Sequence, residues 1–200
     1  MSCKSSEGDI RHYAPLPLYI ALFFLLICIN ALVAKFVVFT FEIAPGVSLF
    51  YIVVASMIVF TLWFGLWGAG AAYIGCFIGA GLLSGIPWDI SLYWSLADLI
   101  QVLVPLIAFR YTRADIALSN IRDLGILILS GVLINNLAGA AWGTLTLAWG
   151  GIIPSGEIIS TVTRWWLGNA IVCAILLPLV LRVMTPVIRN HELFVTRLLR

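Results

Sequence analysis

Polar side chains inside long apolar runs are the residues of this sequence that could do chemistry. Hydrocarbon strongly penalises a buried polar or charged group unless that group is paired or hydrated. The apolar runs contain Asn30, Lys35, Asp98, Gln101, Asn135, Asn136, Arg164 and Asn169. No His-x-x-x-His pair, Walker loop, nucleophile elbow or pair of intramembrane aspartates accompanies them. We therefore expect no enzymatic activity, no catalytic residue, no metal site and no cofactor.

Asp98 is the one acidic residue near the middle of an apolar run. Ser95 precedes it by three positions and Gln101 follows it by three, which gives one face of a helix a polar character. In a structural interpretation, Asp98 pairs with Lys35 or Arg164 and joins two helices. In a functional interpretation, it anchors a ligand or a proton. Both interpretations stay open at this point.

A second polar face is predicted in the run near residue 140. Residues at helical spacing share one face there, namely Asn135, Gly139, Trp142, Thr146 and Trp149. Amide, hydroxyl and indole groups on one face could line an outward-opening cavity, or they could serve packing. The adjoining face carries small residues and an asparagine, which suits close helix contact: Asn136, Ala140 and Gly143.

The last apolar run begins with Arg164, Trp165 and Trp166, and Asn169 follows about one turn deeper. An interfacial anchor explains Trp165, because indole prefers headgroup depth and arginine extends outward. It does not explain Asn169. We therefore expect any ligand site in the outer half of the membrane, lined by Asp98, Gln101, Asn135, Trp142, Trp149, Arg164, Trp166 and Asn169.

The elements that position these residues are transmembrane helices. The 200 residues are 62% hydrophobic and 10% charged, whereas soluble domains have about 25% charged residues. A bilayer core of about 30 Å needs about 20 apolar residues per helix, and backbone groups in lipid must pair internally. The sequence predicts an all-α bundle of six spans: 16–39, 47–64, 66–83, 91–109, 124–149 and 160–181.

Lysine and arginine orient this bundle. They concentrate before the first span, between spans four and five, and in the tail, which predicts that both termini are cytoplasmic in a multi-pass protein of the cell membrane. The expected organisation is a cytoplasmic segment 1–15, a transmembrane domain 16–182 and a basic tail 183–200. A net charge of +2 is too small to indicate nucleic acid, so the lipid bilayer is the first expected partner.

Three local features complete the pattern. Trp63 and Trp67 flank Gly65, which predicts a tight turn at a membrane interface. The Gly75-x-x-x-Gly79 pattern predicts close helix packing, more plausibly within the chain than between chains. Residues 191–200 alternate apolar and charged side chains at near-helical spacing, which suits a helix on the inner membrane surface or a connecting helix.

Some of these residues resemble a known family. Segment 164–170, Arg-Trp-Trp-Leu-Gly-Asn-Ala, and segment 176–181, Leu-Leu-Pro-Leu-Val-Leu, are similar to the last conserved helix of the MASE1 membrane-associated sensor domain. Segment 135–151 resembles its penultimate helix, and Ala-Pro-Gly-Val at 44–47 resembles the start of an early span. The resemblance implies an input module of bacterial signalling proteins that binds a small ligand or membrane partner.

The chain departs from that family in two ways. Asn169 stands where the family tends to have aspartate, so a charge-dependent role of this position is in doubt. The family has about eight spans and a cytoplasmic output domain, whereas we expect six spans and a short tail here. Signalling would therefore pass to a separate partner protein.

A second resemblance is to the substrate-binding S components of energy-coupling-factor vitamin transporters. These proteins have a similar size, six spans and both ends inside. The glycine-dense third span and the Pro-Gly-Val-Ser-Leu segment at 45–49 are compatible with them. The Ala-x-x-x-Ala pattern that docks their membrane partner is absent from the first span, where Ala31 and Ala34 are one residue too close. The resemblance implies a transport partner in place of a signalling partner.

Overall fold

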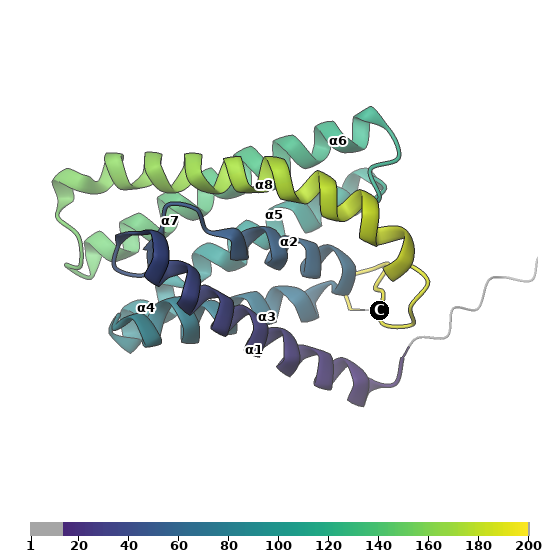
Figure 1. Cartoon of the computed structure of the whole chain (residues 1–200), viewed down its shortest axis with the longest axis horizontal. Coiled ribbons are helices and arrows are strands. Elements are labelled where there is room, and N and C mark those ends of the chain that lie inside the picture. The colour runs from purple at the N-terminus through teal and green to yellow at the C-terminus, as the bar shows by residue number, and fades with distance from the viewer. Residues whose placement is uncertain (1–13, 200) are drawn as a thin grey trace, which may run out of the picture.

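The computed structural model describes residues 14–199. Within this range it describes only the backbone of residues 37–41. Almost all of this part of the chain is helical (Figure 1). The α-helices are α1 (Leu16–Phe41), α2 (Ile52–Phe64), α3 (Leu66–Cys76), α4 (Trp88–Trp94), α5 (Leu96–Thr112), α6 (Ile121–Leu127), α7 (Asn135–Trp149) and α8 (Ile158–Ile188). Wider π-helical turns extend α3 over Phe77–Gly81 and join α6 to α7 over Ile128–Ile134.

Five of the continuous helical segments are long and apolar enough to cross a bilayer. They are Leu16–Phe36, Leu66–Ser84, Trp88–Thr112, Ile121–Trp149 and Ser155–Ile188. Large apolar side chains remain exposed along them, for example Phe24 at 61% and Ile175 at 64%, as expected where lipid replaces water. This is the architecture of an all-α multi-pass membrane protein, in agreement with the sequence.

The second predicted span, 47–64, begins too early. Helix α2 has only 13 residues, which rise about 20 Å. The preceding residues form an antiparallel hairpin of β1 (Glu42–Ala44) and β2 (Val47–Ser48). Pro45 and Gly46 make its turn, with Gly46 at φ +74°, the pairing typical of a type II turn. The Glu42 carboxylate accepts a hydrogen bond from the Gly46 amide, which holds the turn closed.

The predicted turn at Gly65 is confirmed. Gly65 has φ +61° and separates α2 from α3, a conformation that glycine adopts without strain. The flanking Trp63 faces the interior of the bundle, however. It is 5% exposed and donates its indole N–H to the Thr185 hydroxyl of α8.

The tail also differs from expectation, because residues 190–199 form turns in place of a helix and fold back onto the bundle. The Val195 amide donates to the Trp63 carbonyl, and the Leu66 amide donates to the Leu198 carbonyl. The turn between α2 and α3 leaves these backbone groups unpaired within the helices, and the tail satisfies them. The start of α1 lies at the same end of the bundle, where the Ala14 amide donates to the Glu192 carbonyl (Figure 1).

Glycines of α3 and its extension pack against α1, which confirms internal packing. A Cβ atom at Gly75 would lie 2.5 Å from the Asn30 Cβ, and one at Gly79 would overlap the backbone of Ala31. These two helices approach closely because neither glycine has a side chain. Their contact fixes α1 at the outside of the bundle and leaves α2 and α5 inside.

Candidate functional site

A small cavity lies beneath the 42–48 hairpin, at the end of the bundle opposite the tail. Its volume is about 10 Å³, which is about the room that one water-sized molecule needs. Residues from five elements surround it: Gly46, Val47, Ser48, Tyr51, Trp94, Asp98 and Trp165. The cavity is therefore assembled by tertiary packing and not by one helix face.

The hairpin contributes its side chains because it is inserted into the bundle. Val47 and Ser48 are 1% and 2% exposed. A Cβ atom at Gly46 would lie 2.7 Å from the Ala80 carbonyl oxygen, and one at Gly168 of α8 would overlap the carbonyl of Leu49. Two glycines thus create the space in which this segment sits, and Tyr51 follows it at the start of α2.

The opposite wall comes from α4, α5 and α8. Ser95 separates α4 from α5, and its hydroxyl donates to the Ser91 carbonyl at 2.7 Å. Trp94 and Asp98 are four residues apart and therefore lie on the same side of this helical segment. The Trp94 ring packs against Trp165 with centroids 6.0 Å apart and planes inclined by 42°. Asp98 is 3% exposed. The Cys76 thiol lies beside both Asp98 and Tyr51.

Four buried polar atoms of the residues around this cavity lack hydrogen-bond partners. Within the described residues, no hydrogen bond reaches the Ser48 hydroxyl, the Tyr51 hydroxyl or Asp98 Oδ1. The Trp94 indole N–H is unpartnered in the same way and lies next to Gly143 of α7. Buried polar groups in proteins are nearly always hydrogen-bonded. Several unpartnered polar atoms around one cavity make it the candidate binding site for a polar molecule.

The structural interpretation of Asp98 is wrong. Across residues 14–199 the one ion pair joins Arg189 to Asp115. The Lys35 ammonium donates to the Leu83 carbonyl, and Arg164 is exposed. Neither cation lines the cavity. Asp98 is therefore not holding two helices together through an ion pair with these residues.

Gln101 and Asn135, expected at the site, form a buried amide network next to it. The Gln101 side-chain amide donates to Asn136 Oδ1 at 2.8 Å, and the Asn135 amide donates to the Gln101 carbonyl at 3.3 Å. A Cβ atom at Gly139 would overlap the Gln101 side chain. This network joins α5 to α7 and keeps the helix that carries Asp98 in place.

The predicted polar face of α7 divides into two parts. Its inner part packs against Gln101, whereas Trp142 and Trp149 are 42% and 72% exposed. These two indoles line a separate open depression of about 250 Å³ together with Tyr93, Leu145 and Thr146. The Trp142 indole donates to the Tyr93 carbonyl at 2.8 Å. The structure does not bring Trp142 or Trp149 to Asp98.

The α8 residues are also distributed differently from expectation. The Trp166 indole donates to the Leu133 carbonyl, in the π-helical turns before α7, at 3.2 Å. Asn169 is fully buried, and both of its amide atoms are without a hydrogen bond among the described residues. Neither residue lines the cavity. Trp165, interpreted from the sequence as an interfacial anchor, is 4% exposed and lines it instead.

Sequence reasoning found Asp98 but missed Ser48, Tyr51, Trp94 and Trp165. Ser48 and Tyr51 were assigned to a span, so their polar groups looked like ordinary helix residues. The combination of Pro45 and Gly46 just before an apolar run was the available signal. No comparable signal marks Trp94, because tryptophan occurs at buried and interfacial positions alike.

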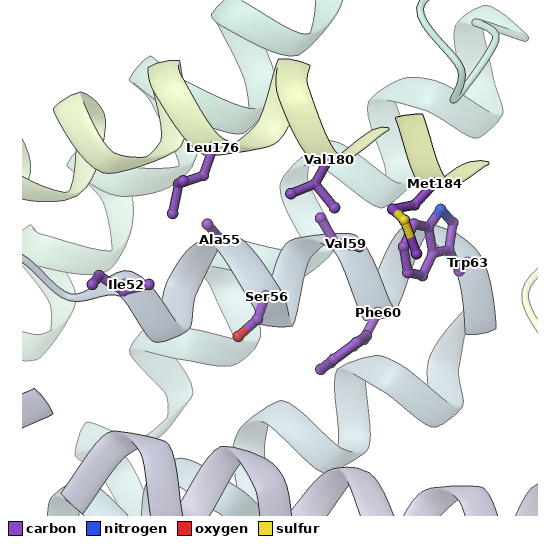
Figure 2. A pocket seen from close by; sticks show the side chains of 9 residues that line it. All are labelled: Ile52, Ala55, Ser56, Val59, Phe60, Trp63, Leu176, Val180 and Met184. Atoms are coloured by element: carbon purple, nitrogen blue, oxygen red, sulfur yellow. The ribbon is translucent and has the colours of Figure 1, made fainter. Parts of the chain in front are cut away.

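A larger apolar groove runs between α2 and α8 and has a different character. Figure 2 shows its lining, with Leu176, Val180 and Met184 of α8 facing α2. Its volume is about 250 Å³. The polar groups at its edge are already satisfied, since Ser56 donates to the Val53 carbonyl and Trp63 to Thr185. The groove offers no unpaired atom to a polar guest, unlike the cavity at Asp98.

Comparisons with protein-family models, with curated proteins and with solved structures found no match to this chain.

Proposed function

We propose that this protein is a non-enzymatic membrane module that binds a small ligand and signals to a separate partner protein. The observation that carries the proposal is the cavity at Asp98, where the Ser48, Tyr51 and Asp98 oxygens are buried without partners. Leaving such groups unpaired costs about 1–3 kcal/mol each. A ligand that forms hydrogen bonds with these oxygens recovers this cost, so ligand binding at this site would stabilise the folded protein.

The position of α2 supports a signalling role. Tyr51 at its start lines the cavity, and its last turn contacts the tail. Arg110 of α5 donates to both the Leu62 and Val195 carbonyls, at 3.2 and 2.7 Å. A displacement of Tyr51 by ligand would therefore move the helix on which the tail rests. We place the signalling partner at this end, which the distribution of lysine and arginine predicts to be cytoplasmic.

The alternative is a substrate-binding component of a small-molecule transporter. The observation that favours it is the hairpin, which covers the cavity at the end opposite the tail. A ligand arriving from outside would need only this segment to move. In that case the partner is a coupling ATPase with its membrane scaffold, and the ligand is handed on.

Native mass spectrometry of the protein extracted from its own membrane distinguishes the two functions. We expect a complex with a kinase or cyclase for signalling, and a complex with a coupling ATPase for transport. The same preparation tests ligand binding, because Trp94 and Trp165 line the cavity and report on it by fluorescence. Intrinsic catalytic turnover, together with recovery of neither partner, would contradict both functions.

A further inference from the structure

The charge and size of the cavity at Asp98 restrict what can bind there. Asp98 is the one carboxyl group among its lining residues, and no cationic side chain of the described residues lines it. The two hydroxyl groups of Ser48 and Tyr51 can each accept a hydrogen bond through oxygen. With Asp98 Oδ1 they offer three unpartnered oxygen atoms. An anionic guest would meet a carboxyl group with nothing to offset the repulsion.

The remaining walls are aromatic. Trp94 and Trp165 lie on the cavity, and Tyr51 contributes a third ring. The face of an indole or phenol ring attracts a cation through its quadrupole, most strongly where water is excluded. A carboxyl group, oxygen acceptors and aromatic faces are together suited to a positive charge.

We infer that this cavity binds a water-sized, singly charged cationic group, held by Asp98 with Ser48 and Tyr51. Two sources share this chemistry, namely an alkali ion and an ammonium group with three N–H donors. The volume of about 10 Å³ excludes a quaternary ammonium headgroup. The inference rests on the proposed function for the existence of a ligand site and adds the chemical class of the ligand.

A bound cation supplies the positive charge that the protein lacks next to Asp98. A buried carboxylate is costly unless it is paired, and the pairing with Lys35 or Arg164 is not made. A bound cation provides the missing charge and satisfies the Ser48 and Tyr51 oxygens. Because Ser48 lies in the hairpin and Asp98 in α5, the cation also holds the hairpin against the bundle.

The test uses the full chain, purified in detergent with N-methyl-D-glucamine chloride as the only salt. Sodium chloride, methylammonium chloride and choline chloride are each titrated at constant ionic strength, while thermal unfolding and tryptophan emission are recorded. We expect saturable stabilisation by sodium or by methylammonium and none by choline. Sodium alone would identify an alkali-ion site, and methylammonium alone would identify an amine site.

Single substitutions test whether the cation response depends on the residues of this cavity. Asp98→Asn should abolish the cation response, whereas Asp89→Asn, an exposed residue of the neighbouring α4, should keep it. Ser48→Ala and Tyr51→Phe should weaken the apparent affinity about tenfold each, because each loses a hydrogen bond to a charged group. These two variants keep the test decisive if Asp98→Asn does not fold.

The outcomes separate this inference from the proposed function. A wild-type protein indifferent to sodium and methylammonium, or an Asp98→Asn variant that responds as the wild type does, overturns the cation site. If a neutral polar compound instead changes the tryptophan emission in a Ser48-dependent way, the ligand-binding function stands without a cation. A cation response in a protein that has neither expected partner supports the site and contradicts the proposed function.

Discussion

Gln101 and Asn136 pair their side-chain amides in the interior of the bundle. Both residues are fully buried. Asn136 also donates to the Val132 carbonyl, whereas the Gln101 side chain would lose its acceptor if Asn136 were removed and would then stand unpaired in a low-dielectric environment. This pairing is the main polar link between α5 and α7. The polar interior of this protein is therefore most sensitive to single substitutions at these two residues.

We expect Asn136→Ala to destabilise the protein by about 1–3 kcal/mol, because the Gln101 amide loses its acceptor. The measurement is reversible unfolding in detergent, by denaturant or heat. The double variant Gln101→Leu/Asn136→Leu should recover part of this loss, since neither polar group then remains unpaired. A double variant whose loss equals the sum of both single losses would contradict the pairing.

Asp115 gives a pH dependence outside the membrane spans. Burial alone raises the pKa of its carboxyl, but hydrogen bonds from the Ser119 hydroxyl and the Ala117 amide, together with Arg189, outweigh it. The net result is a pKa below the ordinary value. Such a group stabilises the folded state above its unfolded pKa of about 4, and this stability is lost as the pH falls through the lower folded pKa.

We therefore expect the melting temperatures of the wild type and Asp115→Asn to differ most near pH 6. The difference should shrink as the pH falls below about 4, because protonation removes the same charge that the substitution removes. It should be modest, since both side chains of the ion pair are partly exposed. A difference that stays constant down to pH 2 would show that Asp115 acts through something other than its charge.

At the scale of elements, the hairpin 42–48 and helix α8 can lie close together because Gly168 has no side chain. The Leu49 carbonyl occupies the space where a Cβ atom would stand. An added methyl group in a well-packed region costs about 1–3 kcal/mol. The backbone of the hairpin must move to accept it, because a carbonyl cannot change rotamer.

Gly168→Ala should thus expose the hairpin. We expect a cysteine placed at Ser48 to react at least several times faster with a maleimide in the Gly168→Ala background, measured against the chain that lacks the new cysteine. Gly156→Ala is the control, because a Cβ atom there meets open space among the described residues. Equal reactivity in both backgrounds would mean that Gly168 does not position the hairpin.

At the scale of the whole molecule, both described ends of the chain lie at one end of the bundle. Five segments of the described residues are long and apolar enough to span a membrane, and α2 is a shorter apolar helix of 13 residues. Six crossings, with both ends on one side, require that α2 and the hairpin together act as the sixth. The orientation itself follows from the lysine and arginine pattern and is a prediction.

Cysteine labelling from one side of sealed vesicles tests that orientation. Asp89 and Arg113 are both exposed and lie before and after α5. We expect Asp89→Cys to react from the outside and Arg113→Cys only from the cytoplasmic side. Labelling of both positions from the same side would contradict the topology, and the unsubstituted chain gives the background from its native cysteines.

The sequence by itself determined the all-α membrane class, the turn at Gly65 and the position of Asp98 as a buried carboxyl group. These follow from local physics: lipid demands long apolar helices, a glycine between apolar runs permits a turn, and a buried carboxyl is costly wherever it stands. None of them depends on which helices are neighbours.

The tertiary structure alone decided which residues surround Asp98. Ser48, Tyr51, Trp94 and Trp165 come from distant segments, and helical spacing in one segment carries no information about another. Spacing placed Trp149 with Asn135 on one face of α7, but that face runs from the buried interior to the exposed end. Burial depends on the neighbours that pack along a helix, so only the packed bundle separates the residues of the cavity from those of the surface.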